Sequence, residues 1–498
     1  MGGVASVMIL CAASTTAWAT TEAERTTTDA VAERAPVLRR EASSEEKNTI
    51  MDAVRGRLAT KTAYASADGA ARVFSETPPP AGCGEATFVN VVARHGTRHS
   101  SKIARLDALA ARLGLPWRYP GGDASQASLL TPRGREEHYE LARRLRARYP
   151  LAFASVVSPA SRTTIRATSK SRAVQSAEAF ALGAFDYDDD DDPALVVTAS
   201  GGVPAENEGS TRAFRVEIPA ANDSDRQLRF FDHCAAHAAW EAALERNATS
   251  EYARYLASDE FEAALAAFRR RVGRGVPNEA GSSTTTESSS VSAADLLLAY
   301  EGCAYDVVVA DADDRWCGLV ADHVAVLEYA KDLDEWYENG PGNPVARTMP
   351  VELLRDLVAA FDDAVASSLA AATEDDVRAP NTTRRRSALR FAHAETLLPL
   401  ATMLGLFDAQ PAPTAARLDD ARRFRTSVVA PMAANLVATL HPCGGASASK
   451  VKVLYNEREV VLPACAAEGV YCDLATLKRA FHDALHVWDF DALCGNAD

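Results

Sequence analysis

The chain has no surplus of positive charge. Its 498 residues include 53 Lys and Arg against 68 Asp and Glu, so the formal net charge is −15 at pH 7. A general nucleic-acid binder carries a basic excess, and this balance therefore argues against that class of protein. A polyanionic ligand is not excluded, because a basic cleft can lie inside an acidic body. The hydrophobic share of 47% is that of an ordinary globular protein.

Long apolar runs are equally scarce. The apolar segment 428–440 is interrupted by Pro431 and Asn435, so it predicts a core element rather than a membrane span. The apolar residues 4–13, followed by the small-x-small sequence Ala17-Trp18-Ala19, predict an export signal over residues 1–19, although no Lys or Arg precedes them. We therefore expect an exported chain with no membrane span.

The cysteines agree with export. The predicted signal removes Cys11 from the nine cysteines, and an even number in an exported chain predicts four disulfides. The remaining eight are Cys83, Cys234, Cys303, Cys317, Cys443, Cys465, Cys472 and Cys494. Eight cysteines allow about 105 connectivities, and only the short spacings favour particular pairs, Cys303 with Cys317 and Cys465 with Cys472. Glycosylation sequons at Asn222, Asn247 and Asn381 also favour a secreted or endomembrane-lumen protein.

The hydrophobic pattern predicts an α/β core with an inserted, mainly helical lobe. We expect a mobile lead-in and first helix over 20–80, the first part of the α/β core over 81–200, the helical lobe over 201–385 and the second part of the core over 386–498. Within the core the pattern predicts strands at 87–93, 153–157 and 389–392, helices at 101–113 and 134–149, and a hairpin over 450–462 with its turn near Asn456 and Glu457.

The predicted strand 87–93 ends in Arg94-His95-Gly96-Thr97-Arg98. Guanidinium groups match phosphate oxygens with two parallel hydrogen bonds, and neighbouring cations keep an imidazole neutral. Because ligands bind at the carboxyl ends of strands in α/β sheets, His95 would there be a nucleophile directed at a bound phosphoryl group. A short basic turn taken alone is also common at a solvated strand end.

A second motif has the same form. The predicted strand 389–392 is followed by His393-Ala394-Glu395, at the start of a predicted helix. A helix N-terminus favours anions, and a histidine there can donate to a phosphate oxygen. A carboxylic acid two residues later can protonate a departing alkoxide. By contrast, His482 and His486 are spaced like a metal pair but lack a third ligand, so we predict no metal site.

With these motifs the chain resembles the histidine acid phosphatase superfamily, and more narrowly its multiple inositol polyphosphate phosphatase, phytase-like branch. The H-A-E form of the second motif points to that branch. The resemblance covers residues from about 80 to 475 in the order of the family. Besides the two motifs it is carried by Ala167-Thr168-Ser169-Lys170-Ser171-Arg172, Arg229-Phe230-Phe231-Asp232-His233-Cys234, Trp316-Cys317 and Val453-Leu454-Tyr455-Asn456-Glu457. The family often has tyrosine and proline where this chain has His99 and Ser100, so we expect altered pocket walls.

The resemblance implies a role for each site residue. His95 would attack phosphorus and become a phosphohistidine, and Glu395 would protonate the leaving oxygen and then activate water. The transferred group would be held by Arg94, Arg98, Arg172 and His393. No metal or cofactor is required, since arginines neutralise the phosphoryl charge.

The resemblance thus implies a fold, a histidine-phosphatase-like mixed sheet flanked by helices with the helical lobe inserted. It also implies a phosphoric monoester hydrolase acting on small, highly phosphorylated inositols such as phytate. One alternative is a broad acid phosphatase acting on sugar phosphates or 2,3-bisphosphoglycerate. Another is a catalytically silent polyanion-binding protein, against which the presence of both His95 and Glu395 argues. The sequence leaves the oligomeric state open.

Overall fold

The structure, a computed structural model, describes the chain in segments. These are residues 51–67, 76–153, 163–185, 196–199, 215–219, 225–273, 291–312, 315–370, 386–408, 410–416, 418, 421–444 and 448–496. The predicted export signal 1–19 and two of the three sequons, at Asn222 and Asn381, lie outside these residues. The third, Asn247, is exposed at the end of a helix.

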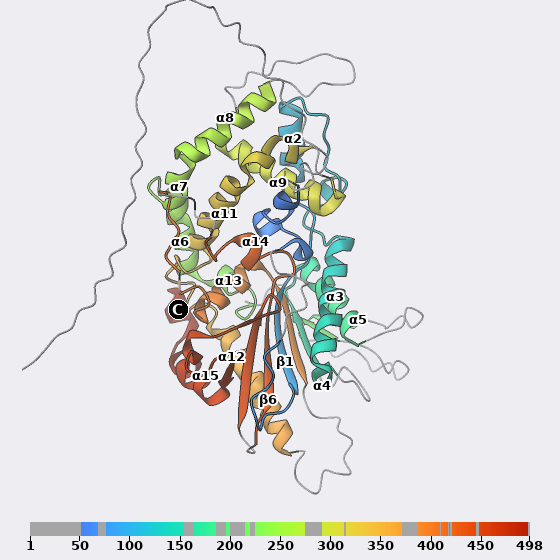
Figure 1. The fold of residues 1–498 in the computed structure, drawn as a ribbon, viewed down its shortest axis with the longest axis vertical. Coiled ribbons are helices and arrows are strands. Elements are labelled where there is room, and N and C mark those ends of the chain that lie inside the picture. Colours follow the sequence, from blue (N-terminus) through green and yellow to red (C-terminus); the bar gives the residue numbers. More distant parts are fainter. Residues whose placement is uncertain are drawn as a thin grey trace, which may run out of the picture.

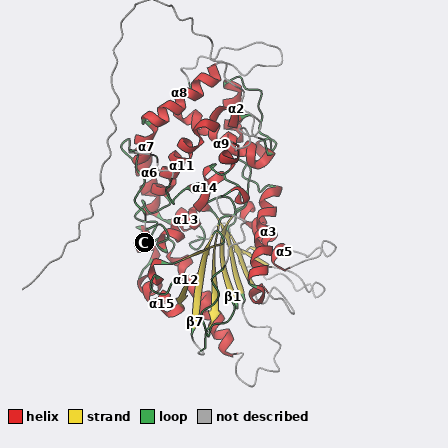
Figure 2. Ribbon diagram, in the orientation of Figure 1, coloured by secondary structure: helices red, strands yellow, loops and turns green. Residues whose placement is uncertain are grey.

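A mixed sheet forms the centre of the fold (Figures 1 and 2). Its strands lie in the order β3-β4-β2-β5-β1-β6-β7-β8, and β9 pairs with β7. The first five strands in this order are parallel, whereas β6 to β9 pair in antiparallel fashion. The strands are β1 (Phe88–Arg94), β2 (Thr163–Ala167), β3 (Val196–Ala199), β4 (Arg215–Ile218), β5 (Ser387–Ala392), β6 (Asn435–Pro442), β7 (Ser449–Tyr455), β8 (Arg458–Val460) and β9 (Tyr471–Asp473).

Helices cover both faces of the sheet, which is why β1 is buried along its whole length. Phe88 and Val92 pack on α12 (Val351–Ala370), where the rings of Phe88 and Phe361 have centroids 5.8 Å apart. Val89 and Val91 point to the other face, toward α3 (Pro132–Arg148) and α5 (Ser171–Phe185). A central strand covered on both faces reads as a continuous β-branched run, as this one does.

A helical lobe lies at one end of the sheet (Figure 1). Its core joins α2 (Ile103–Arg112), α7 (Glu251–Leu256), α8 (Asp259–Gly273), α9 (Ala293–Ala310), α10 (Trp316–Val320) and α11 (Val324–Glu338). The remaining helices are α4 (Pro150–Phe153), α6 (Ala235–Arg246), α13 (Ala394–Met403), α14 (Thr426–Val429), α15 (Leu474–Ala480), α16 (His482–His486) and α17 (Phe490–Cys494), with a short 3₁₀ turn, η1, at Ala59–Lys61.

The lobe and the sheet do not divide the chain at the predicted boundaries, 201 and 385. Strand β4 falls inside the predicted insert but pairs with β2 in the sheet, and α12 packs on the sheet. Conversely α2 and residues 54–63 pack in the core of the lobe. The chain therefore passes between the two parts several times, and both contribute to the region above the carboxyl ends of the strands.

Most predicted elements of the core are confirmed. The strands at 87–93 and 389–392 are β1 and β5, and the helices at 101–113 and 134–149 are α2 and α3. The hairpin turns at Asn456 and Glu457, both with positive φ, as a two-residue hairpin turn requires. The predicted strand at 153–157 is wrong at its start, because Pro150 opens the short helix α4, which ends at Phe153. Residues 154–157 lie outside the described part.

Four disulfides join the eight cysteines after Cys11. The two short-range pairs, Cys303–Cys317 and Cys465–Cys472, are as predicted. The other two, Cys83–Cys443 and Cys234–Cys494, close loops of 360 and 260 residues. Within the described segments, no helix combines the length and apolar character needed to cross a membrane.

Candidate active site

The ends of three neighbouring strands bring the two sequence motifs together. In the ladder between β1 and β5, Arg94 lies opposite Ala392, so the next residues, His95 and His393, are neighbours. Their rings have centroids 5.5 Å apart. Strand β2 ends on the other side of β5, where the Thr168 amide donates to the carbonyl of Phe391. Parallel pairing thus gathers residues that are far apart in the sequence at one edge of the sheet.

The His95 ring is oriented by its own loop. Its Nδ1 lies 2.9 Å from the carbonyl oxygen of Gly96, an acceptor only, so Nδ1 carries the proton and donates. This leaves the lone pair of Nε2 available as a nucleophile. The side chain is buried, and its pKa is held well below its usual value by burial and by the charges of Arg94 and Arg172. His95 therefore stays neutral in mildly acidic solution, as a nucleophile must.

Helix α3 holds this loop in place. Glu137 on α3 accepts from the amide and hydroxyl of Thr97, at 2.7 and 2.9 Å. Gly96 packs directly on Gly134 in the first turn of the same helix. A Cβ atom on Gly96 would lie 2.3 Å from the Gly134 carbonyl oxygen, closer than real Cβ contacts come. The glycine is needed here for close approach of two backbones.

We expect Gly96→Ala to displace the loop and lower kcat/KM by about 100-fold or more, because a 1 Å misplacement near the reacting atoms costs that much. The fold should survive, since the displacement is local. Phosphatase kinetics alongside a thermal unfolding curve check this. Gly318→Ala is the matched control, because its Cβ would meet nothing within 4 Å. An alanine at position 96 that left kcat/KM unchanged would contradict the close-approach argument.

Three guanidinium groups surround the two histidines. Arg94 is nearly buried and uses one Nη to bind the carbonyl oxygens of Thr60 and Ala430, both at 2.6 Å. Arg98 donates to the carbonyl of His99 at 2.8 Å. The Nε atoms of Arg94, Arg98 and Arg172 are buried and have no hydrogen-bond partner. The charges of all three arginines lower the pKa of His95, so the three guanidinium groups lie close to one imidazole. A cluster of guanidinium groups of this kind indicates a site for an oxygen-rich anion.

The second histidine is contacted from three sides. Thr168 Oγ1 and Arg229 Nη1 each lie 3.0 Å from His393 Nε2, while Arg172 Nη2 lies 3.4 Å from Nδ1. Burial and the nearby Arg172 and Arg229 lower the pKa of His393 well below its usual value. Sequence reasoning assigned no role to Arg229 or Thr168, although both lie in segments that carried the resemblance.

Glu395 occupies the first turn of α13, two residues after His393. Its side chain is exposed although the residues on either side of it in the helix are buried. Its carboxylate is close enough to oppose the effect of burial on two guanidinium groups. Burial lowers the pKa of Arg94, and it lowers the pKa of Arg172 to about 10. The charge of Glu395 acts in the opposite direction on the pKa of both arginines. The predicted acid therefore lies beside the arginines that surround His95.

Lys61, in η1, is a site residue that the sequence reasoning missed. Its ammonium donates to Thr60 Oγ1 at 2.9 Å, next to the carbonyl that Arg94 holds. Burial lowers the pKa of Lys61 to about 8; Glu301 raises it, and Arg98 and Arg94 lower it further. Lys61 thus lies beside the two arginines of the first motif. No strand–loop pattern marks this lysine, which explains the omission.

Helix α11 carries two carboxyl groups, those of Glu335 and Glu338, that interact with the charge of Glu395. Burial, Glu395 and Asp334 raise the pKa of Glu335 to about 7. Burial, Glu335 and other neighbouring carboxylates raise the pKa of Glu338 to about 9. In mildly acidic solution both side chains are therefore neutral and do not oppose the binding of an anion.

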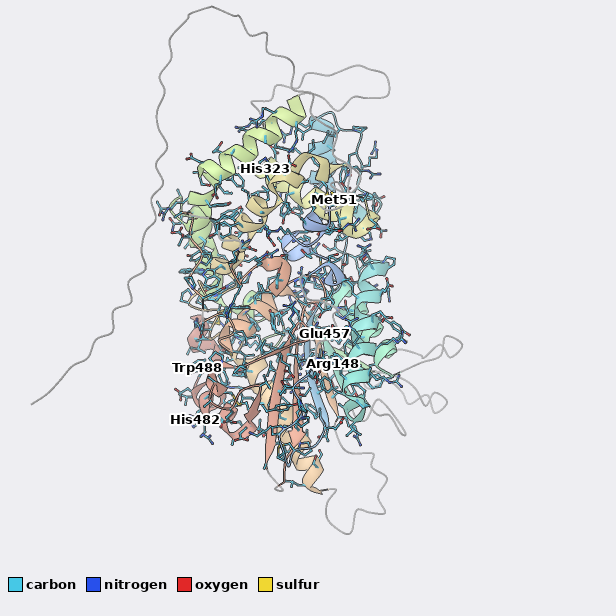
Figure 3. All side chains as sticks on the ribbon, in the orientation of Figure 1. Met51, Arg148, His323, Glu457, His482 and Trp488 are labelled. Atoms are coloured by element: carbon cyan, nitrogen blue, oxygen red, sulfur yellow. A yellow bond between two sulfur atoms is a disulfide. The ribbon has the colours of Figure 1, made fainter. Side chains whose placement is uncertain are left out.

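Other predicted features lie away from the strand ends. His482 is at the surface of the molecule (Figure 3), with its side chain 64% exposed beside Asp483. In the part of the chain that the structure describes, no three His, Cys, Asp or Glu side chains form a metal-binding group. His99, where the family often has tyrosine, is buried against Tyr119, and the amide of Ser100 donates to the Tyr119 hydroxyl at 2.9 Å.

The fold and these residues define a class, the α/β enzymes that bind a phosphoryl group with arginines beside a neutral histidine. The chain belongs to the histidine phosphatase superfamily (branch 2), whose sequence model matches residues 85–456. This confirms the predicted family, the predicted fold class and the predicted enzyme class, a phosphoric monoester hydrolase.

Individual relatives agree with the narrower resemblance. The chain is 28% identical to multiple inositol polyphosphate phosphatase 1 of Gallus gallus, over 83% of this chain and 85% of the relative. The Homo sapiens protein of the same name is 25% identical over 89% of each chain. The phytase from D. castellii has the same fold, with a TM-score of 0.61 at 15% identity over 92% of this chain and 91% of that one. The Bifidobacterium longum multiple inositol polyphosphate phosphatase complexed with inositol hexasulfate has a TM-score of 0.53 at 19% identity, over 87% of this chain and 98% of that one.

Proposed function

We propose that this protein hydrolyses phosphomonoesters of inositol polyphosphates through a phosphohistidine on His95. The observation that carries the proposal is that the charges of three arginines, Arg94, Arg98 and Arg172, act on the His95 imidazole, whose Nδ1 donates to the Gly96 carbonyl and whose Nε2 is left as the nucleophile. Phosphoryl transfer needs little beyond positioning and charge stabilisation, and this arrangement supplies both. The named relatives support inositol polyphosphates as the substrate class.

The proposed reaction has two steps. Nε2 of His95 forms a bond to phosphorus as the ester oxygen leaves, and Glu395 gives its proton to that oxygen. Arg94, Arg98, Arg172 and His393 hold the three remaining oxygens. Water then attacks the phosphohistidine, the deprotonated Glu395 takes a proton from it, and the phosphorus–nitrogen bond breaks. Inorganic phosphate leaves, and both His95 and Glu395 return to their starting states.

The test of this function is a time course with inositol hexakisphosphate. We expect stepwise release of inorganic phosphate and the appearance of a series of lower inositol phosphates. Ion-exchange chromatography of samples taken over time measures both. Sugar monophosphates and 2,3-bisphosphoglycerate serve as the comparison substrates. A higher kcat/KM on those than on inositol hexakisphosphate would favour a broad acid phosphatase instead.

Lys61 favours a polyphosphorylated substrate over a monoester. Its ammonium bonds within the described residues only to the Thr60 hydroxyl, so it has donors to spare beside Arg94 and Arg98. A single phosphoryl group is already served by the arginines and His393. The lysine therefore supports contact with a second phosphate of the same molecule.

We expect Lys61→Met to raise KM for inositol hexakisphosphate about 10-fold, since a charge-assisted hydrogen bond contributes about 1.5–3 kcal/mol. With p-nitrophenyl phosphate, which has one phosphate, the change should stay within about 2-fold. Initial rates on the two substrates measure this. Lys478→Met is the control, because Lys478 pairs with Asp362 on α12 and not with the site. Equal losses on both substrates would contradict a second phosphate contact.

The disulfides support the proposed compartment. Four disulfides persist in oxidising surroundings, which supports a secreted or endomembrane-lumen enzyme. The export signal at 1–19 and the three sequons remain predictions. N-terminal sequencing of the secreted protein and enzymatic removal of glycans test them.

A further inference from the structure

His393 presents a choice between two tautomers. A neutral imidazole carries one proton, so one ring nitrogen donates and the other accepts. Guanidinium N–H groups are directed at both nitrogens: Arg229 Nη1 lies 3.0 Å from Nε2 and Arg172 Nη2 lies 3.4 Å from Nδ1. Arginine has no acceptor, so only one of these two contacts is a hydrogen bond.

Distance decides which contact is the bond. A separation of 3.0 Å is an ordinary N–H···N distance, whereas 3.4 Å is beyond the usual range for a hydrogen bond. The Thr168 hydroxyl is also 3.0 Å from Nε2 and can donate to it. Nε2 is therefore the acceptor, and the proton lies on Nδ1.

The consequence concerns the phosphoryl site. With the proton on Nδ1, two donors, Nδ1–H and the Arg172 guanidinium, face each other and need a common acceptor. A phosphoryl oxygen supplies it, and the unpartnered Nε of Arg172 lies in the same group. The reverse tautomer would let Arg172 donate to Nδ1 and would point the His393 proton at Thr168 instead. That arrangement removes two donors from the substrate.

The position of Arg229 against His393 is fixed by neighbouring side chains. Its side chain is only 18% exposed, and its guanidinium is ion-paired to Asp232 and lies 5.2 Å over the ring of Phe231. Phe231 in turn packs edge-on against the ring of His393, with centroids 6.4 Å apart. The segment from Arg229 to Asp232 thus fixes both the donor and the plane of the ring that it contacts.

We propose that Arg229 is a positioning residue that holds His393 as the Nδ1–H tautomer, so that His393 and Arg172 grip one oxygen of the transferred phosphoryl group. This inference rests on the proposed function for its catalytic consequence. The tautomer itself is a property of the free protein and can be measured without any substrate.

The experiment labels the histidines of the full chain with ¹⁵N and reads the imidazole nitrogen shifts, with His393→Gln to assign the signal. We expect the free protein to show the proton on Nδ1. In Arg229→Met the proton should move to Nε2, because Arg172 is then the stronger donor to Nδ1. Thr168→Val should keep the Nδ1–H form, since Arg229 still donates.

Binding of vanadate, an analogue of the transition state, gives the functional readout. We expect Arg229→Met to weaken vanadate inhibition and lower kcat/KM on p-nitrophenyl phosphate about 100-fold, as loss of an oxyanion donor does. Asp232→Asn is the matched control: it removes the ion pair but leaves an acceptor for Arg229, so the tautomer should persist and the loss should stay within about 10-fold.

Two results would overturn the inference. One is an Nε2–H signal for His393 in the unsubstituted protein. The other is Arg229→Met with the tautomer unchanged and losses equal to those of Asp232→Asn, which would make Arg229 structural only. Failure of the proposed function is distinguishable from both, because it would show as no phosphate release from inositol hexakisphosphate while the ¹⁵N shifts still report Nδ1–H.

Discussion

His95→Ala is expected to abolish turnover, with kcat lowered by about 10⁵-fold or more, the scale on which removal of a catalytic nucleophile acts. The neighbouring imidazole of His393 cannot replace it, because that ring is held by Arg229 and Thr168. The fold should remain, since the variant gives up local contacts only: the hydrogen bond from Nδ1 to the Gly96 carbonyl, worth about 1 kcal/mol, and the edge contact with the ring of His393.

The covalent step can be observed directly. Protein quenched during turnover of ³²P-labelled substrate should carry label that is stable in base and lost in acid, as expected of a phosphohistidine, and His95→Ala should carry none. His441→Gln is the matched control, because His441 is also buried but lies at the far end of β6, beyond the residue that pairs with the start of β1. Label or turnover retained in His95→Ala would refute the covalent route.

The two histidines of the site, His95 and His393, could be predicted to lie together because each directly follows a strand. Both motifs follow β-branched or apolar runs, and neighbouring parallel strands place their carboxyl ends together, so His95 and His393 could be expected to meet. The ladder between β1 and β5 shows why: Arg94 and Ala392 are register partners. One local pattern, repeated, was enough to predict that the two histidines are neighbours.

The periphery was not predictable in the same way. Lys61 lies in a 3₁₀ turn near the start of the described chain, and tertiary contacts place it, among them the hydrogen bond from Arg94 to the Thr60 carbonyl. Arg229 follows an irregular segment and meets His393 through tertiary packing. Neither position has a periodicity that marks it, since its role is set by the folded chain alone.

The short-range disulfides could be predicted from the sequence, whereas the long-range ones could not. Cys303 and Cys317 are 14 residues apart, so closing the short loop between them costs little chain entropy, and the pair could be predicted from the spacing. Cys83 and Cys443 are 360 residues apart and meet because β1 and β6 pair in antiparallel fashion, which places both cysteines beyond the same end of that ladder. A long-range disulfide becomes predictable only after the sheet order is known.

Glu395→Gln is expected to lower kcat/KM on inositol hexakisphosphate by about 10³-fold, within the range for loss of a general acid. Glutamine keeps the size of the side chain at the start of α13 but has no proton to give to an alkoxide. An activated aryl ester should lose much less in kcat/KM, because p-nitrophenolate leaves without a proton. This difference between leaving groups identifies the acid step.

The second half of the reaction gives a sharper signature. With the base also missing, water attacks the phosphohistidine slowly, so Glu395→Gln given p-nitrophenyl phosphate should release one nitrophenol per site in a rapid burst and then stall with His95 phosphorylated. Stopped-flow absorbance measures the burst. Glu335→Gln, which removes the neighbouring carboxyl group on α11, should show no burst, since His95 still has Glu395 beside it. Equal losses on both esters and no burst in Glu395→Gln would place the acid and base elsewhere, and a burst in Glu335→Gln would assign the base to α11 instead.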